Sequence, residues 1–271
     1  MINLLRRLHR RLTSLPYGGP LYARLMNRCR LPQRAGDAAA WARRLRKKQP
    51  PPYPKEIYRY LQDQFRGSRQ ELEDRLIHYV PLFHALPPQP WPWPVVDLGC
   101  GRGEWLALLG RHNIPARGVD TSRKMIDACR LRGLDVVAGD VLDYLQRLPE
   151  NLAPAITAIQ LIEHLPPPVL VALLKESFRV LRPGGLLLLE TPNPENFQVS
   201  AYYFYLDPTH RHPIPPPLAT YTMAAVGFTG IRVLRPEAYE PPIFEDPRLN
   251  RFFCVAMDYA AIGYKPHADK G

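Results

Sequence analysis

Three alternate glycines form the stretch of this 271-residue chain whose residue types and spacing best suit ligand binding. They lie in residues 95–105, V-V-D-L-G-C-G-R-G-E-W, where an apolar run reaches Asp97 before Gly99, Gly101 and Gly103. Glycine tolerates positive φ and lets a ligand approach the backbone, and a helix that begins near Gly103 directs its free N–H groups toward the loop. The stretch therefore predicts a strand, a tight ligand-binding loop and a helix.

The spacing of these glycines argues against a dinucleotide. The last glycine of a G-x-G-x-x-G fingerprint would have to stand at position 104 or 106, where the chain has Glu104 and Leu106. The carboxylate of Asp97 would also repel a diphosphate, whereas it suits a ligand with an ammonium and a sulfonium group, such as S-adenosylmethionine. Glycine triplets also occur in ordinary turns, so this stretch alone leaves that alternative open.

Two further aspartates stand where the next strands are expected to end. Asp120 follows the glycine loop by about 20 residues, at a point where a carboxylate can accept both hydroxyl groups of a ribose. Asp140 stands at the end of the following expected strand. Each aspartate taken alone is equally consistent with a helix N-cap. Together with Asp97 they predict three acids at the ends of three successive strands, all facing one crevice.

An alternation of strands and helices must position these acids. We expect strands at residues 95–97, 116–120, 135–140, 155–162, 186–190, 231–234 and 252–257. We expect helices at residues 103–111, 122–133, 170–181 and 218–226. The wholly apolar run 186–189 is typical of a parallel strand covered on both faces. The pattern predicts an α/β fold, with a Rossmann-like, seven-stranded, mostly parallel sheet, helices on both faces and an N-terminal helical extension.

The glycine loop and the acids that follow it resemble, in the same order, the motifs of class I S-adenosylmethionine-dependent methyltransferases. The resemblance implies that S-adenosylmethionine is the cofactor. It also implies that Asp140 accepts a hydrogen bond from the adenine amino group, with the Val141 backbone beside it. The cofactor-binding residues implied are Arg66, Asp97, Gly99, Gly101, Gly103, Asp120, Asp140, Val141, Gln160 and Leu161.

The fourth expected strand ends in Glu163-His164-Leu165-Pro166, which resembles the E-H-x-P signature of small-molecule and glycan methyltransferases. The Asn/Asp-Pro-Pro-aromatic motif of enzymes that methylate DNA amino groups is absent from this position. His164 is the candidate catalytic base, because an imidazole takes a proton from a hydroxyl near neutral pH. The alternative is that His164 only forms local hydrogen bonds that hold the loop.

A long segment at residues 190–213, expected to be irregular, follows the fifth strand at the point where an acceptor must enter. Together with Phe65-Arg66-Gly67-Ser68-Arg69 it resembles bacterial cell-surface polysaccharide methyltransferases of the O-antigen type, over about residues 55–235. The resemblance implies a sugar hydroxyl or sugar phosphate on a glycan or lipid-linked glycan as acceptor. His210 is the second candidate catalytic residue and is expected to bind the acceptor.

Two other functional alternatives stay open. The first is a small-molecule or quinone-type O-methyltransferase that uses the same strand end, and the second is a non-catalytic module that binds S-adenosylmethionine. Asp207, His210 and His212 have a spacing that a metal ion can use, but no clear fourth ligand accompanies them. We therefore expect no metal site.

The charge of the chain is concentrated at its N-terminus. Residues 1–50 hold 13 of the 36 Lys and Arg and one of the 25 acids, so the rest of the chain has a net charge of −1. We expect three regions: a basic amphipathic tail at 1–50, a helical cap at 51–90 and a methyltransferase domain at 91–265. The tail suits an anionic membrane surface, with a docking helix, a poorly ordered tail or a transit peptide as alternatives.

The remaining composition excludes several classes of protein. No apolar run approaches the roughly 20 residues that cross a bilayer, and the four cysteines have no C-x-x-C pairing. These features predict a cytoplasmic protein, peripheral on the inner membrane if the tail binds there. Because the net positive charge is confined to the tail, we expect no nucleic-acid partner.

Overall fold

The structure is a computed structural model that describes residues 69–87, 91–236 and 244–267. The basic tail, Arg66 and the first part of the expected helical cap lie outside these ranges. Within the described residues, no helix is long and apolar enough to cross a membrane.

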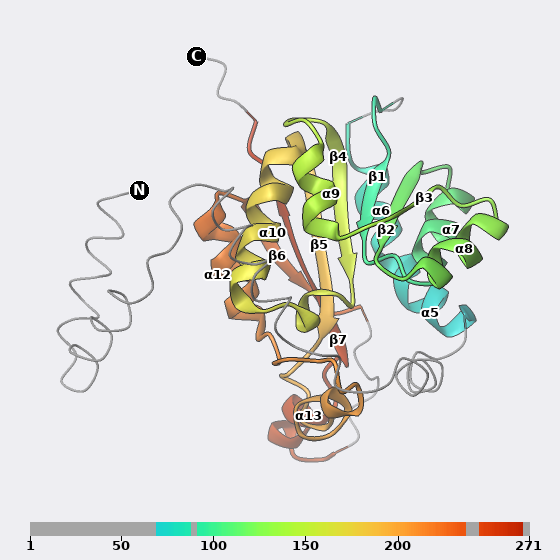
Figure 1. Cartoon of the computed structure of the whole chain (residues 1–271). Helices are drawn as coiled ribbons and strands as arrows, with labels where there is room; N and C mark the ends of the chain where they lie inside the picture. Colours follow the sequence, from blue (N-terminus) through green and yellow to red (C-terminus); the bar gives the residue numbers. More distant parts are fainter. Residues whose placement is uncertain (1–68, 88–90, 237–243, 268–271) are drawn as a thin grey trace.

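Seven strands form one sheet in the order β3-β2-β1-β4-β5-β7-β6 (Figure 1). The strands are β1 (Val95–Leu98), β2 (Ala116–Asp120), β3 (Val136–Ala138), β4 (Ala153–Ile159), β5 (Leu181–Pro192), β6 (Thr229–Leu234) and β7 (Asp258–Tyr264). Neighbouring strands are parallel except where β7 pairs with β5 and with β6. The predicted Rossmann-like, mostly parallel sheet is confirmed.

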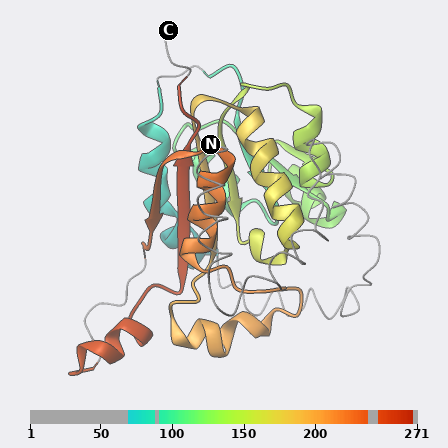
Figure 2. The ribbon, with the colours of Figure 1, turned by 90° about the vertical axis from the view of Figure 1, so that its left-hand side faces the viewer.

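Helices cover both faces of this sheet. The α-helices of the described residues are α5 (Arg69–Leu76), α6 (Val80–His84), α7 (Glu104–Arg111), α8 (Arg123–Leu131), α9 (Val141–Arg147), α10 (Pro167–Val180), α11 (Phe197–Ala201), α12 (Pro216–Val226) and α13 (Pro247–Phe253). Short 3-10 helices are η1 (Ile77–Tyr79), η2 (Ile162–His164) and η3 (Tyr203–Leu206). Figure 2 shows α5 and α6, in cyan, on one side of the sheet and α10 and α12, in yellow and orange, on the other.

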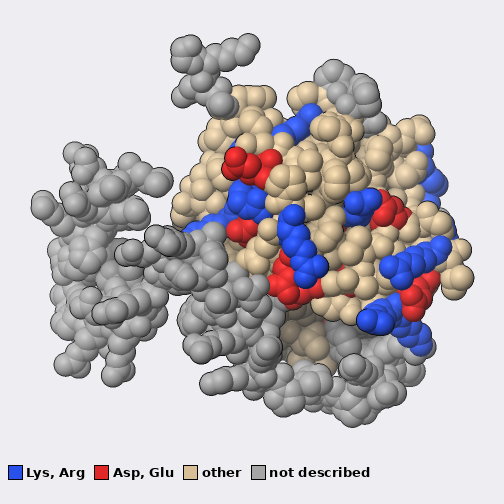
Figure 3. Space-filling model, turned by 45° about the horizontal axis from the view of Figure 1, so that its top comes forward, with Lys and Arg blue, Asp and Glu red and all other residues tan. Residues whose placement is uncertain are grey.

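The described surface has no continuous basic face in the view of Figure 3. There, Lys and Arg side chains are interspersed with Asp and Glu, in keeping with the net charge of −1 outside the tail. The positive charge of the chain therefore belongs mainly to the residues before the described domain.

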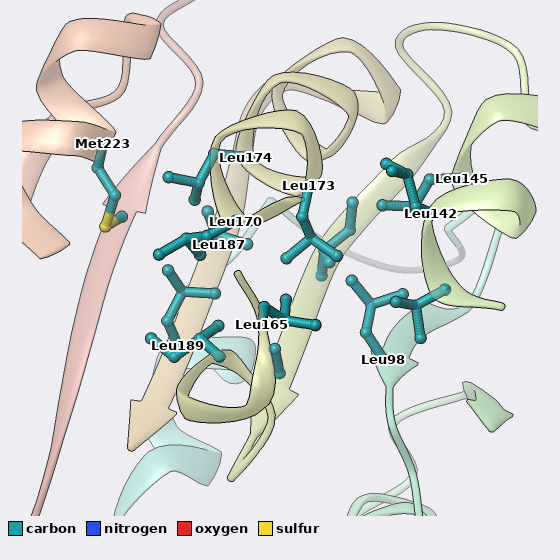
Figure 4. Packing of buried hydrophobic residues seen from close by; sticks show 14 of the residues in the cluster. Leu98, Leu142, Leu145, Leu165, Leu170, Leu173, Leu174, Leu187, Leu189 and Met223 are labelled. Atoms are coloured by element: carbon teal, nitrogen blue, oxygen red, sulfur yellow. The ribbon is translucent and has the colours of Figure 1, made fainter. Parts of the chain in front are cut away.

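The period of two along β5 divides its leucines between two cores. Leu187 and Leu189 pack with α9, α10 and α12, in the cluster shown in Figure 4. Leu186 and Leu188 face the other way and pack with residues of α5, α6 and α7. All four side chains are buried, and burial of a leucine contributes about 1.5–3 kcal/mol. The run is apolar throughout because both faces of the strand are covered.

Two of the expected strands are wrongly placed. Residues 252–257 are not a strand: helix α13 begins at Pro247, directly after Asp246, which accepts a hydrogen bond from the Arg248 N–H at 2.9 Å, and residues 252 and 253 are the last two of that helix. The last strand is β7 instead. Strand β5 begins at Leu181 rather than 186, because Leu181 already pairs with Ala153 of β4 before the register shifts.

The expected irregular segment 190–213 is also partly helical, since it contains α11 and η3. The side chain of Asn196 caps α11, accepting hydrogen bonds from the N–H groups of Gln198 and Val199. The Asn196 amide in turn donates to the Val255 carbonyl at 2.8 Å. A buried asparagine therefore fixes this segment to the connection that precedes β7.

An arginine of the helical cap joins α5 to the carboxyl edge of the sheet. Arg75 is bonded to Asp258 of β7, and its Nη2 lies 3.2 Å from Oε1 of Glu190 in β5. Glu190 is completely buried; burial raises its pKa and the Arg75 guanidinium opposes that rise. The Gln160 amide donates to the same two carboxylates, at 2.8 Å to Asp258 and 3.3 Å to Glu190. Arg75 thus supplies the positive charge for the carboxylates of Glu190 and Asp258, which also bind the Gln160 amide at the end of β4.

Replacing Arg75 tests this connection. Arg75→Ala should lower the free energy of unfolding by about 3–5 kcal/mol, because it leaves Glu190 buried without its ion-pair partner. Arg111→Ala is the matched control: Arg111 pairs with Glu73 at 2.7 Å but is half exposed, so its loss should cost less than about 1 kcal/mol. Urea denaturation measures both values. Equal losses in the two variants would contradict the role given to Arg75.

Candidate active site

The glycine loop between β1 and α7 has the backbone that its sequence predicts. Gly99, Gly101 and Gly103 have φ values of +74°, +52° and +78°. A Cβ on Gly103 would lie 2.6 Å from a methyl group of Leu134 and 2.8 Å from the sulfur of Cys129. A side chain is therefore excluded at Gly103 by φ and by space, and the positive φ values favour glycine at all three positions.

Asp120 holds this loop in place. Its Oδ2 accepts a hydrogen bond from the Gly101 N–H at 3.0 Å, and its Oδ1 accepts one from the Ser122 N–H at 2.7 Å. The aspartate therefore has a structural role in the loop in addition to the ribose contact that the sequence implies, and that contact stays a prediction.

Asp140 is the N-cap of α9, the alternative that the sequence left open. Its Oδ1 accepts hydrogen bonds from the N–H groups of Leu142 and Asp143 at 2.9 and 3.2 Å. Val141 is the first residue of that helix, where a backbone N–H has no acceptor within the helix. The adenine contact stays a prediction. The parallel pairing of β1, β2 and β3 does place the ends that carry Asp97, Asp120 and Asp140 along one edge of the sheet.

Asp97 is the most deeply buried of the three acids, with 2% of its surface exposed. Its Oδ1 accepts a hydrogen bond from the Thr157 hydroxyl at 2.7 Å, and that hydroxyl accepts one from the Trp105 indole at 3.2 Å. Burial raises the pKa of Asp97 to about 7; the Thr157 hydrogen bond opposes the rise, and the carboxylates of Asp120 and Glu104 add to it. Among the described residues, no positively charged side chain compensates this carboxyl group, and the ammonium and sulfonium groups of S-adenosylmethionine would do so.

The end of β4 lies beside the glycine loop because β4 pairs with β1. Leu161 is close enough that a Cβ on Gly99 would lie 3.0 Å from its Cδ1. Gln160 has a φ of +51°, an uncommon backbone conformation for a residue with a side chain. Its amide points to Glu190 and Asp258, as described above, so the cofactor contact predicted for Gln160 stays untested. Arg66, also predicted to bind the cofactor, lies outside the described residues.

His164 and His210, which the sequence places on different segments, are in contact. Their ring centroids are 4.8 Å apart. Nδ1 of His164 lies 2.8 Å from the Thr209 hydroxyl, which donates its proton to Asp207 at 2.6 Å. The Thr209 oxygen must therefore accept from Nδ1 of His164, so Nε2 is the basic nitrogen of the neutral ring. Nδ1 of His210 lies 2.7 Å from the Phe204 carbonyl, which can only accept, so its basic nitrogen is also Nε2.

Both basic nitrogens face Glu163. Nε2 of His164 lies 3.8 Å, and Nε2 of His210 lies 3.9 Å, from Oε1 of Glu163. Glu163 is completely buried, and burial raises its pKa to about 8, against a hydrogen bond of 2.9 Å that the Thr191 hydroxyl donates to Oε2. Oε1 has no hydrogen-bond partner among the residues that the structure describes.

Backbone contacts hold the segment of His210 against the end of β4. The Arg211 N–H donates to the Glu163 carbonyl at 2.9 Å, and the Arg211 guanidinium donates to the His164 carbonyl at 3.0 Å. The Tyr259 hydroxyl donates to the Ile214 carbonyl at 2.8 Å. The two candidate catalytic histidines are therefore fixed relative to each other by the folded chain.

Three residues of this site were not assigned a role from the sequence. Glu163 is the first residue of the E-H-x-P motif, and this position could have indicated that it belongs to the site. The only signal at Thr157 was that it is a polar residue in an otherwise apolar strand. Thr209 had no local signal, because its partner His164 is 45 residues away in the sequence.

The chain is similar to known methyltransferases in its amino-acid sequence. A family model described as a methyltransferase domain matches residues 27–232. Ubiquinone biosynthesis O-methyltransferases of Xanthomonas oryzae pv. oryzae and Xylella fastidiosa are 31% and 33% identical over 106 residues. The alignments cover 36% of this chain and 43% and 42% of those proteins, so the chain spans less than half the length of these curated relatives.

Solved structures share the fold over most of the described chain. A SAM-dependent methyltransferase from Archaeoglobus fulgidus is 30% identical, with a TM-score of 0.68, and the match covers 77% of this chain and 99% of that one. Phosphoethanolamine N-methyltransferase 2 from Haemonchus contortus, in complex with S-adenosyl-L-methionine, is 14% identical, with a TM-score of 0.53 and coverage of 79% and 62%. The second likeness concerns the fold alone.

The raised pKa of Asp97 predicts how S-adenosylmethionine binding depends on pH. Below about pH 7 the free protein holds a proton on Asp97, whereas the cationic ligand favours the carboxylate. Binding should therefore release a proton, and Kd should rise by up to about tenfold per pH unit as pH falls from about 7. Titration calorimetry between about pH 5.5 and pH 7, in buffers with different ionisation enthalpies, measures both effects.

Two variants test whether this pH dependence comes from Asp97 rather than from another acidic residue. Asp97→Asn should bind the ligand more weakly and lose the pH dependence, while Asp127→Asn, at an exposed position of α8, should behave as the parent. A parent protein whose Kd is constant across this pH range would show that Asp97 does not interact with the cationic groups.

Proposed function

Because this chain belongs to the methyltransferase-domain family and is an S-adenosylmethionine-dependent methyltransferase, we propose that its acceptor is a hydroxyl group of a small molecule. The observation that carries the proposal is the convergence of His164 and His210 on Glu163, beside the cofactor loop. Basic nitrogens at this position suit an acceptor that must lose a proton, as a hydroxyl does and an ionised phosphate does not.

The reaction requires alignment and the removal of one proton. When bound, S-adenosylmethionine supplies a methyl group from its sulfonium, with a C–S bond breaking as an O–CH₃ bond forms. The residues around the site have to hold the acceptor oxygen at about 3 Å from that methyl group, in line with the bond that breaks, and exclude water. His164 is proposed as the group that assists loss of the hydroxyl proton through Nε2, and His210 as the group that binds the acceptor.

The relatives support a small acceptor more than a glycan. Those reported above are named ubiquinone biosynthesis O-methyltransferases, although they match this chain over only 106 residues. Exposed aromatic side chains of α11, of residues 202–205 and of α13 also offer apolar surface. This surface includes η3, whose Phe204 ring centroid lies 4.6 Å from that of His210, and Figure 2 shows α11 and α13 near one end of the sheet. The exposed aromatic residues are Phe197, Tyr202, Tyr203, Tyr205 and Phe252. The glycan acceptor, hydroxyl or phosphate, is therefore the second candidate.

Transfer of a labelled methyl group tests the proposal. The full chain should methylate a hydroxyl of small phenolic or quinol acceptors more efficiently than free glycans, lipid-linked glycans or sugar phosphates, and the product should be an O-methyl ether. Preferential labelling of a glycan fraction, or of an amine, would overturn the small-hydroxyl assignment.

Histidine variants locate the chemistry. His164→Ala and His210→Ala should each lower kcat/KM on the true acceptor, by about 10²–10⁴-fold where proton removal is affected. The Kd for S-adenosylmethionine should stay near the parent value in both, since neither residue is assigned to the cofactor. The control is His78→Ala, at an exposed position of η1, which should retain parental turnover. Parental kcat/KM in a variant lacking both His164 and His210 would show that the active site is elsewhere.

We further propose that the basic tail at residues 1–50 brings the enzyme to anionic lipid, where an apolar acceptor would partition. Deletion of residues 1–48 should abolish sedimentation with anionic vesicles while turnover of a soluble acceptor persists. Added salt should weaken the parental binding in the same way. Undiminished vesicle binding by the truncated protein would exclude this role for the tail.

A further inference from the structure

We propose that Glu163, His164 and His210 form a binding site for a divalent metal ion at the acceptor end of β4. One oxygen of Glu163 and one nitrogen of each histidine lie within 4.8 Å of one another. The separations of 3.8 and 3.9 Å from Oε1 to the two Nε2 atoms are too long for hydrogen bonds. Ligands about 2.0–2.2 Å from a shared ion lie about 3.3–3.6 Å apart in a tetrahedral site, so these atoms would move slightly closer together when an ion binds.

The histidines present the atoms that a metal ion needs. Both rings use Nδ1–H as a donor, to Thr209 in one case and to the Phe204 carbonyl in the other, which leaves Nε2 as the ligand nitrogen. Histidines that bind metal ions almost always donate their other ring N–H to a carboxylate, a carbonyl or water, which fixes the orientation of the ring. The hydrogen bond from Thr209 to Asp207 extends this arrangement to a carboxylate.

Glu163 gives the independent evidence that a cation belongs here. Its carboxyl group is completely buried, and its Oε1, directed toward both imidazoles, has no hydrogen-bond partner among the described residues. A buried polar oxygen without a hydrogen-bond partner is costly. A bound cation would compensate that oxygen and accept the lone pairs of both rings. A proton shared within the cluster is the competing explanation, and the experiment below separates the two.

The ligand types indicate which ions fit. Two imidazoles and a carboxylate suit Zn²⁺, Fe²⁺ or Mn²⁺ better than Ca²⁺. Oδ2 of Asp207 lies 4.0 Å from Nε2 of His210, but Asp207 is not among the residues whose ligand atoms lie within 4.8 Å of one another. Of the three residues whose spacing was noted in the sequence, Asp207, His210 and His212, only His210 belongs to the proposed set, which Glu163 and His164 complete.

The position of the ion connects it to the chemistry, and this part rests on the proposed function. With three protein ligands, an ion here retains open positions that would bind one hydroxyl oxygen, or two adjacent ones, of the acceptor. It would lower the pKa of that hydroxyl, so that the ion rather than the His164 imidazole promotes loss of the proton. His164 and His210 would then act as ligands. An acceptor with two adjacent hydroxyl groups would bind best.

Calorimetric titration of the chelator-treated full-length protein with Zn²⁺ or Mn²⁺ alone tests the site. The parent should bind one equivalent, and Glu163→Gln and His210→Ala should each weaken binding by at least about tenfold. His212→Ala, which removes a nearby imidazole outside the cluster, should bind as the parent. Because Glu163 is in the interior, thermal melting and the Kd for S-adenosylmethionine establish that each variant is folded, and His210→Ala repeats the test at a less buried position.

The outcomes separate the metal site from the proposed function. If the parent binds no ion, or binds one equally well in the Glu163 and His210 variants, the metal site is overturned, and a hydroxyl acceptor methylated by chelator-treated protein would leave the proposed function intact. If one equivalent binds and is lost in both variants, the metal site is supported, even where the methylated atom proves not to be a hydroxyl oxygen.

Discussion

The burial of carboxyl groups along the carboxyl edge of the sheet is the constraint on which the rest of this structure depends. Asp97, Glu163 and Glu190 are each at most 2% exposed, near the ends of three neighbouring central segments of the chain. A buried carboxylate is tolerated only where hydrogen bonds or opposite charge compensate it. Glu190 has Arg75, whereas Asp97 and Glu163 have one threonine hydroxyl each. The edge is therefore poor in positive charge at the two places where ligands are proposed to bind.

This distribution shows how helix α5 of the expected cap is connected to the strand ends of the sheet. Arg75 approaches from α5 and holds the carboxylates of β5 and β7, and the same carboxylates hold the amide of Gln160. Gln160 is the residue with positive φ at the point where β4 leaves the sheet. Backbone strain of this kind persists where its surroundings hold it firmly, and it is common at functional sites. Through these contacts, Arg75 of α5 helps to hold Gln160 in place, directly before Leu161 and the short helix that contains His164.

The fold itself does not choose the acceptor. The N-methyltransferase from Haemonchus contortus shares this fold at 14% identity, so the fold is compatible with more than one acceptor atom. The segment after β5 completes the candidate site: it contacts η2 through Arg211 and brings His210 against His164. Phe204 is buried against the His210 ring, with centroids 4.6 Å apart, so the position of the imidazole depends on packing as well as on hydrogen bonds.

The amino-acid sequence alone determined the features that local pattern encodes: the alternating strands and helices, the glycine loop, the acids at successive strand ends and the histidine of the E-H-x-P motif. Their signals lie within a few residues, where periodicity and glycine stereochemistry act. Boundaries failed where pairing or capping overrode the local pattern, as at Leu181 and Asp246. Only the tertiary structure decided which groups meet, because Asp97 and Thr157 are 60 residues apart, His164 and Thr209 are 45 apart, and Arg75 and Asp258 are 183 apart. Such contacts arise from strand order, register and loop packing, and no short-range pattern specifies them.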